Sequence, residues 1–522
     1  INYDLVRGGV SCIFSTLTLQ ATLKYVILVL RADTRGEGGI FALYTLVKKT
    51  KTYWLIVPAM IGGSALIADG ILTPAISVSS AVEGLRNIND NINPLPIVII
   101  ILTALFVIQQ FGTILVGKFF GPVMLIWFTM LGILGLHSIL YQVEILKALN
   151  PYYAYHLLVE YPGGFWVLGA VFLCITGAEG LYSDMGHCGK TNIRITWAMV
   201  KVMLVLNYFG QGAWLIQHDG KLLADFQGGN PFFAIMPGWF LITGIIIATA
   251  AAVVASQALI SAGFTLINEA IRLNFWPKVK IVYPTELRGQ LYIPSVNWLL
   301  LAGCIGIVLF FRESSNMEAA YGLTININML MTSVLLTFFM IMKRYTRGFM
   351  FWFIITFFTI ELGFLVANLN KFIHGGYVSL LISIVLITVM VVWYRARKIR
   401  NRYVEFTKLT EYVPLLVELS RDLSVAKYAT HLVYLTSADI QDEIEQKVIY
   451  SILQKQPKRA DIYWFVHVDV VDEPYRMEYK TNIIAIDDVI RVDFKLGFRV
   501  APKINKMFRQ VVAEMVQKHE VD

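Results

Sequence analysis

One carboxylic acid lies in the middle of a long apolar stretch. Asp69 interrupts a run from about residue 54 to residue 82 that is long enough to cross a bilayer. A charge at the bilayer centre costs roughly 2.5–3.5 kcal/mol, so such an acid usually faces a water-filled cavity, a cation or a proton path. Thr73 shares a helical face with Asp69, and Pro74 would leave the Gly70 carbonyl without its helical donor. Oxygen ligands for a cation therefore converge at one depth, and the alternative is an acid paired with a basic residue for packing alone.

A second acid lies between two glycines near the end of a later apolar segment. Glu179 follows Gly177 and precedes Gly180, and hydroxyl groups stand nearby at Thr176 and Tyr182. This pattern permits an unwound helical segment whose free carbonyls and hydroxyls could bind a cation, as in the discontinuous helices of transporters. Ordinary helix packing is the alternative.

Other polar residues in apolar segments have two open interpretations each. Lys24 lies deep in the first segment, where it either forms an ion pair or extends its amine to the interface. Glu361 stands in an aromatic segment and is either proton-linked or structural. Asp184 lies nearer a segment end, which it could cap or neutralise, and Tyr321 has a position typical of anchoring at the membrane interface.

The composition predicts a membrane protein with many spans. Of the 522 residues, 57% are hydrophobic and 15% are charged, which is too apolar for a soluble protein of this size. The net charge of +8 comes from basic residues in short loops, so it indicates topology and not nucleic-acid binding. The four cysteines lack zinc-like or disulfide-like spacing, and the histidines are scattered singly, which argues against an enzyme and gives no indication of a cofactor.

Eleven apolar segments are long enough to span a membrane. They lie at about residues 10–30, 54–82, 95–116, 119–140, 165–183, 195–217, 239–263, 295–311, 320–342, 349–368 and 376–394. Basic residues such as Lys48, Arg194 and Arg344 gather on one side, as does the basic run at 395–402. The positive-inside rule places that side, and the C-terminus, in the cytoplasm. An odd number of crossings then places Ile1 outside.

The composition changes after Arg402, where strands and helices alternate. Strands are predicted at 430–436, 462–470, 475–486 and 489–496, and helices at 439–453 and 503–519. We therefore expect a transmembrane transport domain at 1–394, a basic linker and connecting segment at 395–428, and a cytoplasmic α/β regulatory domain at 429–522. With helices on one face of a mixed sheet, the other face or an edge could pair in a homodimer, and a small anionic nucleotide could bind between two copies.

Several blocks of the sequence resemble the signature blocks of the KUP/HAK/KT potassium-uptake family. They lie at residues 31–39, 69–77, 80–84, 175–189, 207–212 and 319–322. The resemblance covers all eleven segments and, more loosely, the C-terminal region. It implies an all-α polytopic protein with a LeuT-like (APC superfamily) inverted-repeat core of twelve spans. The family's first-span block of the type Gly-Asp-Ile-Gly-Thr-Ser-Pro-Leu-Tyr has no counterpart here, so we expect this chain to lack the first span.

The resemblance implies potassium uptake across the plasma membrane by symport with protons. The expected potassium ligands are Asp69, Thr73, Thr176 and Tyr321, the candidates for proton coupling are Asp69 and Glu179, and the secondary candidates are Tyr182, Asp184, Lys24 and Glu361. The alternatives are an amino-acid or other small-solute transporter of the same fold, or a passive potassium channel. The acidic pattern favours a cation over an amino acid, and no repeated filter loop typical of a channel is present.

Overall fold

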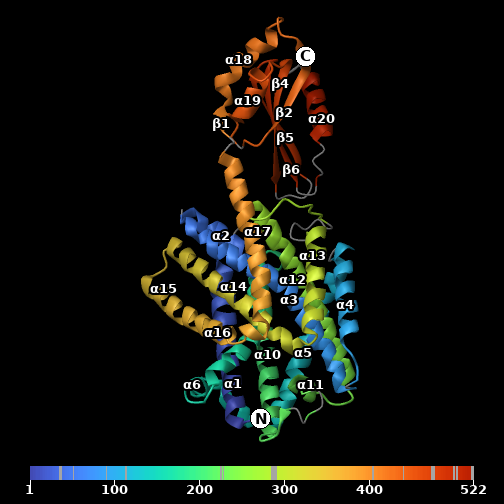
Figure 1. The fold of residues 1–522 in the computed structure, drawn as a ribbon, viewed down its shortest axis with the longest axis vertical. Helices are drawn as coiled ribbons and strands as arrows, with labels where there is room; N and C mark the ends of the chain where they lie inside the picture. Colours follow the sequence, from blue (N-terminus) through green and yellow to red (C-terminus); the bar gives the residue numbers. More distant parts are fainter. Residues whose placement is uncertain are drawn as a thin grey trace. The chain divides into compact units, whose positions relative to one another are not determined.

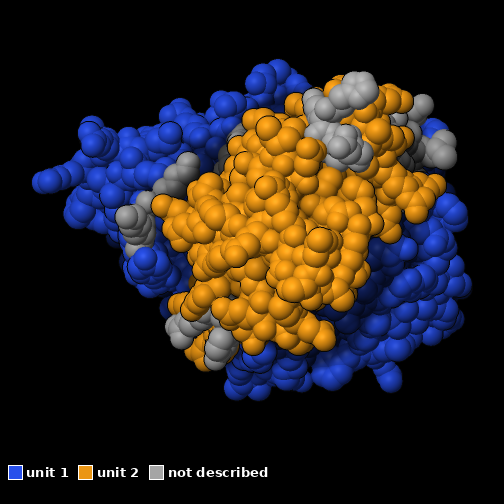
Figure 2. All heavy atoms as spheres, turned by 90° about the horizontal axis from the view of Figure 1, so that it is seen from above, with its two compact units in different colours: residues 1–284, 291–393 blue, residues 285–290, 394–522 orange. Residues whose placement is uncertain are grey.

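The structure is a computed structural model of the chain. It describes residues 1–33, 38–50, 52–89, 91–111, 114–223, 226, 229–283, 291–402, 405–438, 440–471, 476–497, 500 and 504–518. The chain divides into two compact units, residues 1–284 with 291–393 and residues 285–290 with 394–522, which Figure 2 distinguishes by colour. Within the block at 31–39 that carries part of the family resemblance, residues 34–37 lie outside the described residues.

The first unit consists of helices (Figure 1). Its α-helices are α1 (Tyr3–Thr16), α2 (Ile40–Val47), α3 (Ile56–Glu83), α4 (Leu95–Ile108), α5 (Ile114–Tyr141), α6 (Tyr152–Val159), α7 (Leu168–Leu173), α8 (Ala178–Ser183), α9 (Met185–Cys188), α10 (Lys190–Gln217), α11 (Pro231–Ala234), α12 (Leu241–Arg272), α13 (Pro294–Phe311), α14 (Ser314–Met342), α15 (Arg347–Phe353), α16 (Thr359–Leu369) and α17 (Tyr377–Arg402). The π-helical segments are η1 (Leu17–Leu28), η10 (Ile354–Phe358) and η11 (Phe372–Gly376).

Ten helices in the described residues are long and apolar enough to cross a membrane. They are Tyr3–Arg31, Tyr53–Asn87, Phe119–Tyr141, Gly164–Ser183, Lys190–Gln217, Leu241–Arg272, Pro294–Phe311, Ser314–Met342, Arg347–Leu369 and Tyr377–Arg400. The shorter apolar helix Leu95–Phe111 falls on the remaining predicted segment. The prediction of a helical membrane protein with many spans is confirmed.

Helix α3 occupies the centre of the first unit. Its apolar window is 83% buried, against 22% for the window in α17, and α3 packs against α4, α12, α13 and α14. Gly62 and Gly63 allow α2 to approach, because a Cβ atom at either position would lie little more than 2 Å from Ile40 or Phe41. Close packing around α3 therefore fixes the helix that carries Asp69.

The span Gly164–Ser183 is interrupted in its second half. Helix α7 ends at Leu173 and α8 begins at Ala178, with non-helical backbone between them. Gly177 has φ = 92°, a left-handed conformation that glycine adopts without the steric cost of a Cβ atom. The glycine-flanked acid thus follows a break in the helix, as the sequence pattern had predicted.

The second unit contains a four-stranded sheet in the order β2-β4-β6-β5. Its strands are β2 (Lys427–Thr436), β4 (Arg459–Val471), β5 (Met477–Ala485) and β6 (Val489–Gly497), and a separate pair consists of β1 (Phe406–Lys408) and β3 (Glu443–Glu445). Strands β2, β4 and β6 are parallel, and β5 is antiparallel to β6. The helices are α18 (Leu409–Arg421), α19 (Gln446–Leu453) and α20 (Ile504–Gln517). The prediction of a small strand-containing domain at the C-terminus is confirmed.

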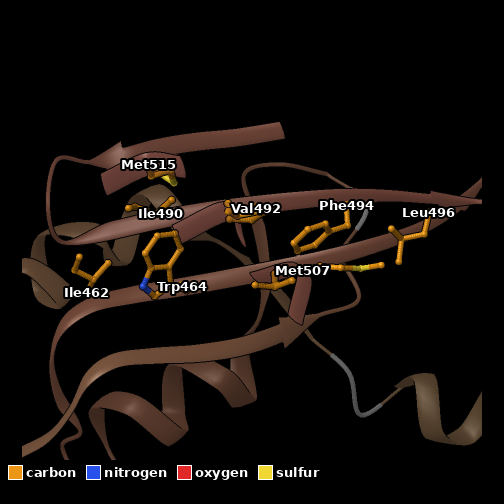
Figure 3. Packing of buried hydrophobic residues seen from close by; sticks show 10 residues of the cluster. Ile462, Trp464, Ile490, Val492, Phe494, Leu496, Met507 and Met515 are labelled. Carbon is orange, nitrogen blue, oxygen red and sulfur yellow. The ribbon is translucent and has the colours of Figure 1, made fainter. Parts of the chain in front are cut away.

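Helices cover both faces of this sheet, so the prediction that they cover only one face is wrong. On one face, Trp464 and its neighbours pack against Met507 and Met515 of α20 (Figure 3). On the other face, Tyr463 and Phe465 pack against α18 and α19. The physical reason is visible in β4, whose central residues are apolar without alternation, as in strands that are buried on both faces.

Two further segments differ from expectation. The predicted helix at 439–453 begins only at Gln446, because Glu443–Glu445 pair with β1 as strand β3, and Asp439 lies outside the described residues. Within residues 395–428, expected to be a linker, α18 contributes the buried residues Leu409 and Leu416 to the core of the second unit.

Candidate functional site

The first part of the site lies in the middle of α3. Asp69 is only 3% exposed, and the Thr73 hydroxyl donates a hydrogen bond of 2.6 Å to Asp69 Oδ1. The spacing of four residues places the two side chains one above the other on the same helical face. Helix α3 continues through Pro74, and in the preceding turn the Ile71 carbonyl accepts a hydrogen bond of 3.2 Å from the Cys304 thiol of α13.

The second part lies at the break between α7 and α8. The Tyr321 hydroxyl of α14 donates to Thr176 Oγ1 at 3.0 Å, and the Thr176 hydroxyl donates to the Leu173 carbonyl at 2.9 Å. The Tyr321 phenol also interacts with the Thr73 side chain and with the Asp69 charge. The structure thus brings together all four predicted potassium ligands, and Tyr321 reaches into this group instead of anchoring at an interface.

We call Asp69, Thr73, Thr176 and Tyr321 the Asp69–Thr176 group. Glu179 lies beside this group, in the first turn of α8. Its side chain is 4% exposed, and one oxygen accepts a hydrogen bond of 3.1 Å from the Gly177 amide. The other oxygen, Oε2, is buried without a hydrogen-bond partner among the described residues. Glu179 interacts electrostatically with Asp69 on one side and with Lys24 on the other.

Lys24 and Glu361 form a buried ion pair, so Lys24 does not extend to the interface. The Lys24 side chain is 0% exposed and the Glu361 side chain 1% exposed. The Lys24 ammonium donates to the Glu361 carboxylate and, at 3.1 Å, to the Met329 carbonyl of α14. The second Glu361 oxygen accepts a hydrogen bond of 2.8 Å from the Ser333 hydroxyl.

The two remaining secondary candidates make other contacts. The Tyr182 hydroxyl donates to the Ala32 carbonyl at 2.6 Å and so holds α8 against the end of the first span. Asp184 joins α8 to α9, and its backbone carbonyl accepts a hydrogen bond from the Cys188 amide. Neither of these contacts belongs to the Asp69–Thr176 group.

Sequence reasoning missed several polar groups near these acids. Gln20 and Tyr25 of η1 are buried and interact with Glu361 and Thr332. Asn328 of α14 is buried and has a side-chain oxygen without a hydrogen-bond partner in the described part of the chain. Ser333 was missed as well, although a hydroxyl in an apolar segment is an available partner for a lone acid. The opposite charges of Lys24 and Glu361 offered a signal for their pairing, but their separation in sequence concealed which residues meet.

The chemistry of the Asp69–Thr176 group suits a monovalent cation. It combines one carboxylate with three hydroxyl groups, and hard oxygen ligands with little negative charge match such an ion. Among the described residues, no three His, Cys, Asp or Glu side chains gather to form a site for a tightly bound metal ion.

Comparison with protein families agrees with this chemistry. Residues 1–398 match the family model described as the K+ potassium transporter integral membrane domain, and residues 429–522 match the K+ potassium transporter C-terminal domain. The chain belongs to the K+ potassium transporter family. Its members are transporters and not enzymes, and the many spans make this chain a multi-pass membrane protein.

Curated relatives extend over the whole chain. The "Probable potassium transport system protein Kup" of Flavobacterium johnsoniae is 62% identical over 527 residues, which cover 100% of this chain and 80% of the relative. Proteins of the same printed name from Latilactobacillus sakei and Clostridium perfringens are 48% and 47% identical, again over 100% of this chain and over 79% and 81% of those relatives.

Proposed function

We propose that this chain takes up potassium across the plasma membrane by symport with protons. The observation that carries the proposal is the convergence of Asp69, Thr73, Thr176 and Tyr321, from three separate parts of the chain, into one hydrogen-bonded group. The names of the relatives indicate potassium as the transported ion. Hydroxyl oxygens and the Asp69 carboxylate would replace part of the water shell of the ion.

The proposed architecture is a LeuT-like inverted-repeat core. Two features of the described helices support it: the break between α7 and α8, and the position of Thr176 within that break, where it accepts a hydrogen bond from Tyr321. Transporters of this kind bind their substrate at discontinuous helices near the middle of the membrane. They open the binding site to one side of the membrane at a time by moving one group of helices against another. The hydrogen bond between Tyr321 and Thr176 would then change as the helix groups move.

We assign proton coupling to Glu179. Asp69 is the acid that binds either the potassium ion or a proton. A buried carboxylate with a free oxygen can accept a proton without losing an existing hydrogen bond, and Glu179 Oε2 meets this condition. The electrostatic interaction between Glu179 and Asp69 links the charge of one acid to the occupancy of the other. Occupancy by potassium and protonation would in this way influence each other.

Rubidium flux into proteoliposomes tests this function. With an inward proton gradient, rubidium uptake by the wild type should accelerate, and Glu179→Gln should remove most of this acceleration while rubidium binding is retained. The matched control is Glu144→Gln, because Glu144 is an exposed acid in the same unit whose partners are Lys147 and Tyr3. Equal proton dependence in Glu179→Gln and in the wild type would refute the coupling role.

The same assay separates the alternatives. A passive channel would conduct rubidium without moving protons and would show a current under voltage clamp that is independent of the proton gradient. An amino-acid or other solute transporter would take up the labelled solute and not rubidium. Uptake of potassium by a host that lacks its own potassium-uptake systems would confirm the substrate in cells.

We further propose that residues after Arg402 form a cytoplasmic regulatory domain that supports a homodimer and binds a small anionic ligand such as a nucleotide. The outer strands β2 and β5 leave sheet edges available for pairing. A cavity of about 630 Å³ lies over β4, β5 and β6. Its lining includes the basic side chains of Lys480 and Lys495 together with the acids Asp469, Glu478 and Asp493. It adjoins the later halves of the parallel strands β4 and β6, and ligands of α/β domains bind near the carboxyl ends of such strands.

Truncation after Tyr403 tests the role of this domain. A monodisperse monomer with altered flux would support the proposal. An unchanged dimer, with unchanged transport and an unchanged response to nucleotides, would refute it. Charge removal at the cavity by Lys480→Met offers a second test, since it should weaken nucleotide binding while the oligomeric state stays the same.

A further inference from the structure

The Lys24–Glu361 pair lies outside the proposed potassium site, yet it is among the most completely buried charge pairs of the first unit. An ion pair inside a protein is costly unless further hydrogen bonds satisfy both partners. Here Ser333 and the Met329 carbonyl of α14 provide those bonds. Lys24 also lies within η1, a π-helical segment, and such segments occur frequently at functional sites.

The pair is connected to the coupling acid through η1. Helix α8, which carries Glu179, packs directly against η1, which carries Lys24. Glu179 interacts with the Lys24 charge, so the ammonium end of the pair is the end that acts on the coupling acid. Glu361 approaches Lys24 from α16. Lys24 therefore interacts with both acids.

We propose that Lys24 is a positioning residue for proton coupling: its ammonium group, held by Glu361 and α14, supplies the fixed positive charge beside which Glu179 exchanges its proton. This inference rests on the proposed coupling role of Glu179. A neutral residue at position 24 would leave two acids near one another without a compensating charge. Glu179 would then carry its proton under conditions in which the wild type releases it.

The other charged and titratable groups around Glu179 come from neighbouring elements. Asp69 acts from α3 and Tyr321 from α14, and Tyr25 acts from η1 itself. On α12, which also packs against α8, Glu269 interacts with Tyr182 of α8. Among these groups Lys24 is the cation, so its removal changes the charge around Glu179 in one direction.

The test is the pH profile of rubidium uptake by the reconstituted full chain. We expect Lys24→Met to move the pH of half-maximal uptake by about one unit toward alkaline pH, the size of effect that a nearby opposite charge exerts on a carboxylate. Lys24→Arg keeps the charge and should retain the wild-type profile. Lys201→Met is the matched control, because Lys201 is a half-buried lysine of another span, α10.

A second variant keeps the test valid if Lys24→Met does not fold. The double variant Lys24→Met with Glu361→Gln removes both charges of the pair, so neither partner is left as an unpaired charge, and it should show the same alkaline shift. In a Glu179→Gln background, Lys24→Met should produce no additional shift, because the charge acts through Glu179.

Several results would overturn the inference. A wild-type profile in the folded Lys24→Met or double variant would do so, as would an equal shift with and without the Glu179 carboxylate. A failure of the Lys24 inference can be distinguished from a failure of the proposed function. If Glu179→Gln alone retains the wild-type proton dependence, the coupling role of Glu179 is wrong. If Glu179→Gln loses that dependence while Lys24→Met leaves it unshifted, only the role of Lys24 is wrong.

Discussion

Replacing Asp69 with asparagine removes the charge of the cation group and preserves its shape. The amide retains an oxygen that can accept the hydrogen bond from Thr73, now 2.6 Å long. Because Asp69 is 3% exposed, solvent screens its charge only weakly. The variant therefore measures the electrostatic contribution of one carboxylate to ion binding, with little change in packing.

The size of the effect follows from Coulomb's law. Two unit charges about 4 Å apart interact by about 4 kcal/mol at an effective dielectric constant of about 20. A loss of that size weakens binding by about a thousandfold, since each 1.4 kcal/mol or so is a factor of ten. We therefore expect Asp69→Asn to abolish rubidium uptake at concentrations that saturate the wild type, while insertion and purification are unaffected.

Rubidium uptake over a concentration series, with rubidium binding to the purified protein, checks this expectation. Asp4→Asn is a suitable control, because it makes the same substitution at an exposed acid in the first turn of α1. If Asp69→Asn takes up rubidium at the wild-type rate, or binds it with nearly wild-type affinity, Asp69 is not the charged ligand of the site.

Further predictions concern the other elements. Tyr321→Phe removes a hydroxyl that donates to Thr176, and we expect about a tenfold weaker apparent rubidium affinity from one lost hydrogen bond, read from the half-saturating concentration. Gly177→Ala adds a Cβ atom that meets nothing within 4 Å but must adopt φ = 92°; strain of about 1–2 kcal/mol should slow uptake at unchanged expression. Trp464→Ala leaves a cavity in the core between the sheet and α20. It should lower the free energy of unfolding of the C-terminal domain by about 3–5 kcal/mol, measured by chemical unfolding; a smaller loss would show that this core collapses around the cavity.

The sequence predicts those parts of the site that depend on local spacing. Asp69 and Thr73 meet because they are one helical turn apart, and the break before Glu179 follows from Gly177. The pairing of Lys24 with Glu361 joins residues that are 337 positions apart. No local pattern specifies such a contact, because it depends on how several helices pack.

The C-terminal domain shows the same limit in another form. Its strands could be predicted because β-branched and aromatic runs identify them, and β4 is found close to its predicted bounds. The prediction that helices cover only one face of the sheet was wrong. Helix α18, which precedes the sheet in sequence, packs on the face opposite α20. The continuous apolar run in β4 carried the information that both faces are buried.

The buried charges of the first unit lead to a last prediction, on stoichiometry. Its described residues include four buried charged side chains, Lys24, Asp69, Glu179 and Glu361, with a net charge of −2. One potassium ion and one proton neutralise this charge, and a neutral loaded state is the cheapest to rearrange in a low-dielectric interior. We therefore expect one proton to move with each rubidium ion, measured by parallel rubidium and proton fluxes in the same proteoliposomes. Glu179→Gln should lower the proton-to-rubidium ratio toward zero, and a wild-type ratio near two would show that a second acid, with Glu361 as the nearest candidate, also carries a proton.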